Sequence, residues 1–142
     1  MRTATIERLR VRYGETDQMG HAYYGNYLLW FEQARGAWCR DRGFTYKSLE
    51  AMGYKLPVVE VFIRYKGEVV YDDLLEIEIE LGEVRRASMQ FVYKIRRSGE
   101  DPVLTEGHTW HVLMGEERRA ITIPPSVREL LDRDPDACET VT

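Results

Sequence analysis

One stretch of the chain, residues 24–42, carries apolar residues at the spacing of a helix. Four of them lie four, three and four positions apart and so share one stripe: Tyr27, Phe31, Ala34 and Trp38. Three more apolar residues widen the stripe on either side: Leu28, Trp30 and Ala37. Gly43 follows directly and suits the position that ends a helix. A helix that is apolar over so much of its surface is expected to be buried on more than one side.

Alternation of apolar and polar residues predicts strands before and after this helix. Residues 75–81 read L-E-I-E-I-E-L, and this perfect alternation predicts one buried face. Four other segments alternate more loosely and are also predicted strands: 5–12, 58–66, 87–97 and 103–114. Links of a few residues join the last three strands, which favours antiparallel hairpins. One strand, one long helix and four antiparallel strands indicate an α+β layer in which the helix lies on the sheet.

The last predicted strand contains two of the three histidines. Its alternation places His108 on one face with Trp110 and Val112, so we expect His108 to be a histidine of the core. His111 is three positions further on and points to the opposite face, so this pair predicts no metal site.

Two short helices complete the expected organisation. One is predicted within residues 45–53, and the other opens at Pro124 and Pro125 and runs through Leu131. The whole chain, 1–142, is expected to be a single domain, with residues 133–142 as a flexible tail.

Composition and charge exclude several classes of protein. With 44% apolar and 31% charged residues the chain is typical of a globular protein, and its net charge of −4 argues against a general nucleic-acid binder. No apolar run reaches the roughly 20 residues that span a membrane, and residues 1–12 carry four arginines and no apolar core, so no signal peptide is predicted. The two cysteines, Cys39 and Cys138, are expected to be free thiols, as in the reducing cytoplasm.

Candidate chemistry gathers in the loop that precedes the long helix. Asp17 lies there between Gly14 and Gly20. A helix N-terminus offers unpaired backbone N–H groups and a partial positive charge, which suit a developing oxyanion. A carboxylate beside such donors indicates carbonyl chemistry of the acyl-transfer type. The alternative is structural, because an aspartate in a loop often caps a turn.

Six residues of this region form a motif that resembles a known family: Asp17, Gly20, His21, Tyr27, Phe31 and Glu32. The motif is similar to that of the 4-hydroxybenzoyl-CoA thioesterase family, in particular the branch related to the Tol-Pal-associated thioesterase. Residues 65–77 and 85–88 match two further stretches of the family pattern. The resemblance implies the hotdog fold, in which an antiparallel five-stranded sheet wraps around one long central helix.

The resemblance also implies roles for individual residues. Asp17 would be the catalytic carboxylate, as nucleophile or general base, and the backbone N–H of Tyr24 would polarise the thioester carbonyl. His21 would orient the carboxylate or a water, or would hold the loop closed. Five residues would bind substrate or coenzyme A, the last three of them from a neighbouring subunit: Tyr65, Lys66, Arg85, Arg86 and Ser88.

Some positions leave the assignment open. Glu32 is the rival carboxylate to Asp17, although we expect it to pair with an arginine such as Arg35. Tyr23 and Tyr24 stand where relatives often carry other residues, so the sequence does not give the acyl group. No metal and no cofactor are expected.

The expected function is that of an acyl-CoA thioesterase. The alternatives are a hydratase or dehydratase of acyl thioesters that uses Asp17 with His21, and an acyl-CoA-binding module without catalysis. A homo-oligomer is expected, either a dimer or a dimer of dimers, since the strand at 75–81 and its neighbours offer an edge that proteins usually cover.

Overall fold

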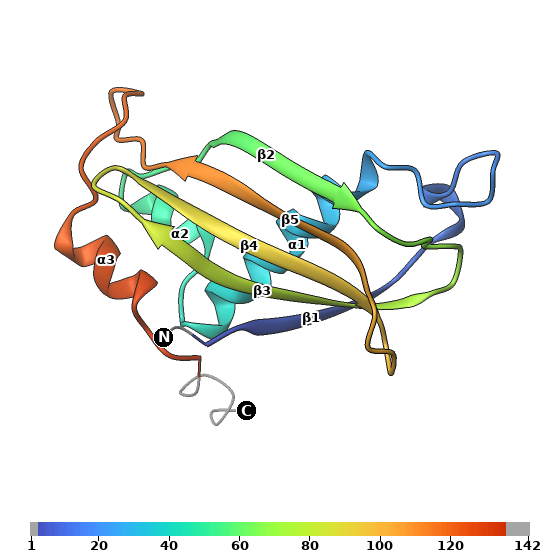
Figure 1. Cartoon of the computed structure of the whole chain (residues 1–142). Helices are drawn as coiled ribbons and strands as arrows, with labels where there is room; N and C mark the ends of the chain where they lie inside the picture. The colour runs from blue at the N-terminus through green and yellow to red at the C-terminus, as the bar shows by residue number, and fades with distance from the viewer. Residues whose placement is uncertain (1–2, 136–142) are drawn as a thin grey trace.

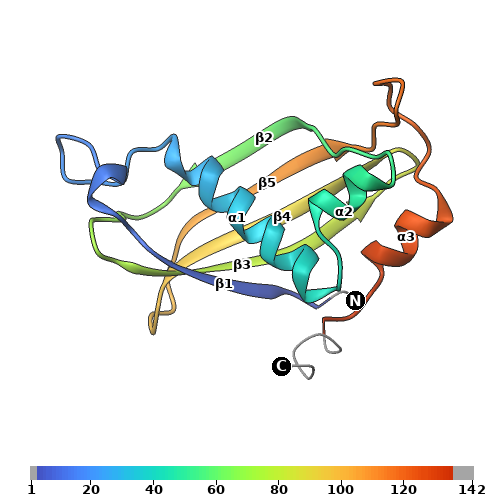
Figure 2. The ribbon, with the colours of Figure 1, turned by 180° about the vertical axis from the view of Figure 1, so that it is seen from behind.

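A five-stranded antiparallel sheet lies against the helix α1 (Asn26–Asp41) in the computed structural model, which describes residues 3–135. The strand order is β1-β3-β4-β5-β2, with bounds β1 (Thr5–Arg10), β2 (Val58–Tyr65), β3 (Leu74–Val84), β4 (Ser88–Arg97) and β5 (Val103–Val112). Figure 1 shows the sheet from the face away from α1, and Figure 2 shows α1 lying along the other face. The α+β architecture and all five strands were expected, and the structure confirms them.

Three short elements join these parts. A 3-10 turn, η1 (Tyr13–Glu15), follows β1, α2 (Tyr46–Ala51) follows α1, and α3 (Pro125–Leu131) lies beyond β5. Thr45 caps α2 by accepting a hydrogen bond from the Ser48 N–H. The predicted tail, 133–142, and Cys138 lie mostly outside the described residues. Arg133 is described and donates to the Arg42 carbonyl at 3.0 Å.

The core is formed between α1 and the sheet face that it covers. All four residues of the predicted stripe are at most 4% exposed. The Phe31 ring stacks on the Tyr93 ring with centroids 3.9 Å apart, and Trp38 meets Phe91 edge to face at 5.1 Å. The helix begins at Asn26, two residues later than its apolar pattern predicted, because residues 23–25 form a turn instead.

The expectation for the faces of β5 is wrong. His111 is fully buried, and the residues that share its face are small or polar: Thr105, Gly107 and Thr109. His108 lies on the opposite face, where its ring stacks with that of Phe62 at 5.3 Å. The large apolar residues Trp110 and Val112 lie with His108 on the face away from α1, so alternation alone indicated the wrong face.

The expected pairing edge is wrong for the strand 75–81 itself and is found at its neighbours instead. The L-E-I-E-I-E-L strand is β3, which lies inside the sheet between β1 and β4, and the edge strands are β1 and β2. Its buried face was predicted correctly, with Leu75 and Ile77 fully buried. Two glutamates on its other face form ion pairs, Glu76 with Arg8 at 3.1 Å and Glu78 with Arg96 at 2.8 Å.

Candidate active site

Backbone hydrogen bonds close the loop that carries Asp17 into a tight hairpin. The Asp17 N–H donates to the His21 carbonyl at 2.8 Å, and Thr16 and Ala22 form an antiparallel bridge just outside this pair. Gly20 turns the chain with φ of +83°, in the left-handed region that favours glycine. The loop therefore holds a fixed shape in front of α1.

The Asp17 carboxylate both caps this turn and keeps one oxygen available. Its Oδ1 accepts hydrogen bonds from the backbone N–H groups of Met19, at 2.9 Å, and His21, at 3.3 Å. Its Oδ2 accepts no hydrogen bond from residues 3–135, and the side chain is exposed. The structural and the catalytic interpretations of Asp17 are therefore compatible, because each needs a different oxygen.

A pocket of about 190 Å³ lies at this loop. It brings together four of the predicted site residues and the wall opposite them: Asp17, His21, Tyr24, Tyr65, Tyr27, Gly67, Glu68, Ala22 and Val69. The predicted catalytic carboxylate and the predicted oxyanion donor thus belong to one pocket. Tyrosine rings make much of its surface aromatic.

The turn before α1 leaves one backbone donor of a pocket residue unpaired. The N–H of Asn26 donates to the Tyr23 carbonyl, and the N–H of Tyr27 donates to the Tyr24 carbonyl. The N–H of Tyr24 has no acceptor among residues 3–135. A free N–H at a helix N-terminus is the group that stabilises negative charge on a carbonyl oxygen.

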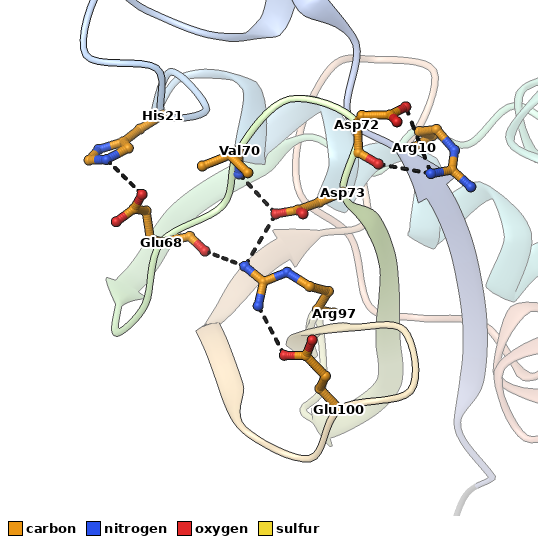
Figure 3. Close-up of polar contacts among 8 residues, drawn as sticks. All are labelled: Arg10, His21, Glu68, Val70, Asp72, Asp73, Arg97 and Glu100. Atoms are coloured by element: carbon orange, nitrogen blue, oxygen red, sulfur yellow. Dashed lines mark hydrogen bonds and ion pairs between the residues drawn. The ribbon is translucent and has the colours of Figure 1, made fainter.

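The opposite wall is the loop between β2 and β3, residues 66–73, drawn in Figure 3. The His21 ring lies with Nε2 3.1 Å from a carboxylate oxygen of Glu68. Arg97 holds this loop from behind, because its Nη2 donates to the Glu68 carbonyl at 2.8 Å and to the Asp73 carboxylate at 3.2 Å. His21 therefore contacts Glu68 through its ring and Asp17 only through its backbone.

Sequence reasoning missed two carboxylates at this site. Glu68 lies in the matching stretch 65–77 but carries no pattern of its own. Glu15 is only 7% exposed, and its carboxylate accepts hydrogen bonds from the Arg12 N–H and the Trp30 indole N–H. Burial would raise the pKa of Glu15, but these hydrogen bonds and the Arg12 charge hold it below its usual value. Glu15 is therefore ionised at neutral pH.

Three of the predicted coenzyme A residues are apart from the pocket within one chain: Arg85, Arg86 and Ser88. Ser88 begins β4, whereas Arg97, which holds the pocket wall, ends it. The Arg85 guanidinium is 2.8 Å from Glu83 and 4.2 Å from the centre of the Trp110 ring. Arg86 donates to the Thr122 hydroxyl at 3.0 Å. Lys66 lies next to the pocket residue Gly67, with its ammonium 3.8 Å from Glu106.

The expected pairing of Glu32 with Arg35 is wrong. Glu32 is exposed and does not line the pocket. Arg35 is buried instead and donates to the hydroxyls of Tyr46, at 3.1 Å, and Tyr93, at 3.0 Å. The helix turns these two side chains in different directions, one to solvent and one to the core.

Two other kinds of feature are absent from the described part of the chain. Within residues 3–135, no group of three or more His, Cys, Asp or Glu side chains is arranged to hold a metal ion. None of the helices in that range is long and apolar enough to cross a membrane.

Comparison with known proteins identifies the family. A model of the Thioesterase-like superfamily matches residues 11–131. YbgC of Escherichia coli O6:H1, an acyl-CoA thioester hydrolase, is 31% identical over 98 residues, which are 69% of this chain and 72% of that protein.

Two crystal structures cover most of the chain. A hypothetical protein from Aquifex aeolicus has a TM-score of 0.84 and 32% identity, over 89% of this chain and 98% of its own. A DHNA-CoA thioesterase from Staphylococcus aureus has a TM-score of 0.83 and 28% identity, over 90% of this chain and 88% of its own. The chain with Asp17 at its pocket therefore belongs to the Thioesterase-like superfamily and has the hotdog fold, as the motif around that residue predicted.

Proposed function

We propose that this protein hydrolyses the thioester of an acyl-coenzyme A to a free carboxylic acid and coenzyme A. The observation that supports this most directly is the pocket in which the free oxygen of Asp17 and the free N–H of Tyr24 occur together. The relatives named as acyl-CoA thioester hydrolase and DHNA-CoA thioesterase support the choice of a coenzyme A thioester.

Asp17 Oδ2 is the reacting group in either of two mechanisms. It attacks the thioester carbon and expels the coenzyme A thiolate, forming a mixed anhydride that water then opens, or it takes a proton from a water that attacks the same carbon. In both, water supplies OH to the acyl group and a proton to the thiolate. The Tyr24 N–H receives the carbonyl oxygen as it becomes negative, a contribution typically worth about 10²–10³-fold in rate.

Coenzyme A requires positive charge, and we propose that a second copy of the chain supplies it. β2 is an edge strand of eight residues, and its Tyr65 end lies at the pocket while its Val58 end pairs with His111. Two β2 edges that pair antiparallel about a two-fold axis would place the Val58 end of one copy beside the pocket of the other. Arg85 lies over Trp110, near that end, so Arg85, Arg86 and Ser88 of the second copy would approach the pocket of the first. Their guanidinium groups suit the phosphates of coenzyme A.

Thiol release from aromatic, short-chain and long-chain acyl-CoAs tests the activity. We expect turnover with at least one class, and we expect Asp17→Asn to lose at least about 10²-fold in kcat, which is the lower range for a general base. Asp101→Asn, an exposed aspartate in the turn after β4, is the matched control and should keep wild-type turnover. Full turnover by Asp17→Asn would contradict the assignment.

The same preparation separates the alternatives. A hydratase would consume the double bond of crotonyl-CoA without releasing thiol. A binding module would bind acyl-CoA tightly without turnover of any substrate.

A further inference from the structure

We propose that Glu15 is a positioning residue for the reaction, holding the Asp17 loop and the Tyr24 N–H in register with each other. This inference rests on the proposed thioester hydrolysis. Glu15 does not line the pocket and does not touch the reacting atoms. It acts through the segments on either side of the pocket.

The Glu15 side chain is anchored to two elements. Oε1 accepts a hydrogen bond from the Arg12 N–H at 2.8 Å, which fixes it to the segment between β1 and η1. Oε2 accepts one from the Trp30 indole N–H at 3.0 Å, which fixes it to the second turn of α1. Trp30 is 2% exposed, so this contact lies in the core and does not compete with water.

The Glu15 backbone carries this anchor to the helix start. Its carbonyl oxygen accepts hydrogen bonds from the Tyr23 N–H at 2.7 Å and from the Asn26 side-chain amide at 2.8 Å. These two donors flank Tyr24, whose N–H is the oxyanion donor. One residue therefore links the helix start to the core of α1.

Glu15 is also two residues from Asp17 in the chain. The bridge between Thr16 and Ala22 closes the base of the hairpin, and the Ala22 N–H donates to the Val69 carbonyl on the opposite wall. A shift of Glu15 would move Asp17 and Tyr24 by different amounts. Asp17 is connected to Glu15 through the chain, whereas Tyr24 is connected to it through the hydrogen bonds that the Glu15 carbonyl accepts. A misplacement of about 1 Å costs on the order of 10²-fold in rate.

A purely local role is the competing interpretation. Glu15 forms a capping box with Arg12 around η1, and removal of such a cap lowers stability without changing the geometry of a folded active site. The two roles predict different values of kcat at a temperature where the variant is fully folded. A positioning role predicts a lower kcat, and a purely local role predicts an unchanged one.

The test uses Glu15→Gln and Trp30→Phe, alone and together, in the full-length protein. A glutamine keeps the size of the side chain but turns an N–H donor toward either Arg12 or Trp30, so one anchor is lost. Trp30→Phe removes the other partner of the same hydrogen bond and keeps an aromatic ring. The control is Arg42→Lys, because Arg42 is 2% exposed and donates at the far end of α1 to the Thr5 hydroxyl and the Trp38 carbonyl.

Steady-state kinetics below the unfolding transition give the readout. We expect kcat to fall about 10–100-fold in Glu15→Gln while KM for the acyl-CoA stays within about threefold, since binding groups are not moved from the pocket. Trp30→Phe should lower kcat in the same direction, and the double variant should be no slower than Glu15→Gln, because both substitutions cut one connection. Arg42→Lys should lose stability and keep kcat.

Two outcomes would overturn the proposal. One is an unchanged kcat in Glu15→Gln with a loss of stability like that of Arg42→Lys. The other is a double variant whose loss is the product of the two single losses. If Glu15→Gln does not fold, Trp30→Phe alone decides, and an unchanged kcat there rejects the proposal. Failure of the wild type to hydrolyse any acyl-CoA would instead reject the proposed function.

Discussion

A chain of hydrogen bonds crosses the core and fixes the protonation state of His111. Nδ1 of its ring lies 3.1 Å from the Leu56 carbonyl, which only accepts, so Nδ1 carries the hydrogen. Nε2 then accepts from the Thr109 hydroxyl at 2.9 Å. Thr109 accepts from Tyr93, and Tyr93 from Arg35. Each hydrogen bond of this series is donated in the direction from Arg35 to Leu56. A second proton on His111 therefore has no acceptor.

This arrangement predicts a loss of stability in mild acid. Burial lowers the pKa of His111 from its usual 6.5 to about 4. Below pH 6.5 the unfolded chain takes up a proton that the folded protein does not, so stability falls between pH 6.5 and about 4 and is unaffected by this group above 6.5. A shift of that size corresponds to about 3 kcal/mol when fully expressed. Urea unfolding at pH 7, 6 and 5 measures it.

The control for this effect is His111→Gln, whose amide can donate to Leu56 and accept from Thr109 but does not titrate. Its unfolding free energy should change less between pH 7 and 5 than that of the wild type. Equal slopes in the two proteins would contradict the prediction. Glu15 does not confuse the comparison, because its depressed pKa places its own loss of stability at lower pH.

The site residues that lie close together in the sequence could be predicted, and those that depend on distant partners could not. Asp17, His21 and Tyr24 lie within eight positions of one another, and the motif around them was sufficient to place them in one pocket. Glu68 was missed because its partner, His21, is distant in the sequence. Glu15 was missed because its partner, Trp30, lies within a helix whose orientation the sequence does not fix.

At the scale of elements, α1 crosses the sheet where β5 has no side chain. A Cβ built on Gly107 would lie 2.4 Å from the Phe62 carbonyl oxygen and 3.2 Å from the Phe31 ring. We expect Gly107→Ala to destabilise the protein by about 1–3 kcal/mol, the usual cost of overpacking. Gly14→Ala is the control, because a Cβ there meets nothing within 4 Å and should leave stability nearly unchanged. Similar denaturation midpoints for the two variants would show that both the β2 backbone at Phe62 and the Phe31 ring of α1 can move away from position 107.

The loop between β2 and β3 depends on one arginine of β4. Arg97 joins the Glu68 carbonyl, the Asp73 carboxylate and the Glu100 carboxylate (Figure 3). We expect Arg97→Met to increase amide hydrogen exchange in residues 66–73, because the variant loses the hydrogen bonds from β4 to the Glu68 carbonyl and the Asp73 carboxylate. The neighbouring Arg96 has the same 29% side-chain exposure and an ion pair with Glu78 on the other face. Arg96→Met should leave exchange in residues 66–73 at the wild-type rate, and equal effects of both variants would reject the assignment to this loop.

Elements were predicted well where a single periodicity decided them. The stripe of α1 and the alternation of β3 each bury one face, so both were assigned correctly. The strand β5 bears Trp110 and Val112 on the face away from α1 and small or polar residues on the face that α1 covers, so alternation indicated the wrong face. The sheet order was not predictable from the short links between strands, because β2 pairs with β5 and not with β3, and β1 pairs with the other side of β3.

At the scale of the molecule, the largest exposed apolar side chains are unevenly distributed. Four of them follow one another along the edge strand β2 and are 41–58% exposed: Val58, Val59, Val61 and Phe62. An edge strand with unpaired backbone groups and an apolar surface is a site where a second chain adds to the sheet. The proposed dimer through β2 accounts for this surface and for the separation of Arg85 from Asp17 within one chain.

Charges placed on β2 test this assembly and its link to catalysis. We expect the double variant Val59→Lys/Val61→Lys to have the mass of one chain by light scattering, because two paired edges would bring four ammonium groups together. We also expect its KM for acyl-CoA to rise by about tenfold or more, as loss of a charge-assisted phosphate contact would cause. Ile6→Lys is the matched control, since Ile6 is 46% exposed on the other edge strand, β1, and should leave both mass and KM unchanged. A wild-type protein with the mass of one chain and full activity would reject the assembly. A variant with the mass of one chain and an unchanged KM would instead show that one chain binds coenzyme A by itself, with Lys66 then the nearest predicted cation to the pocket.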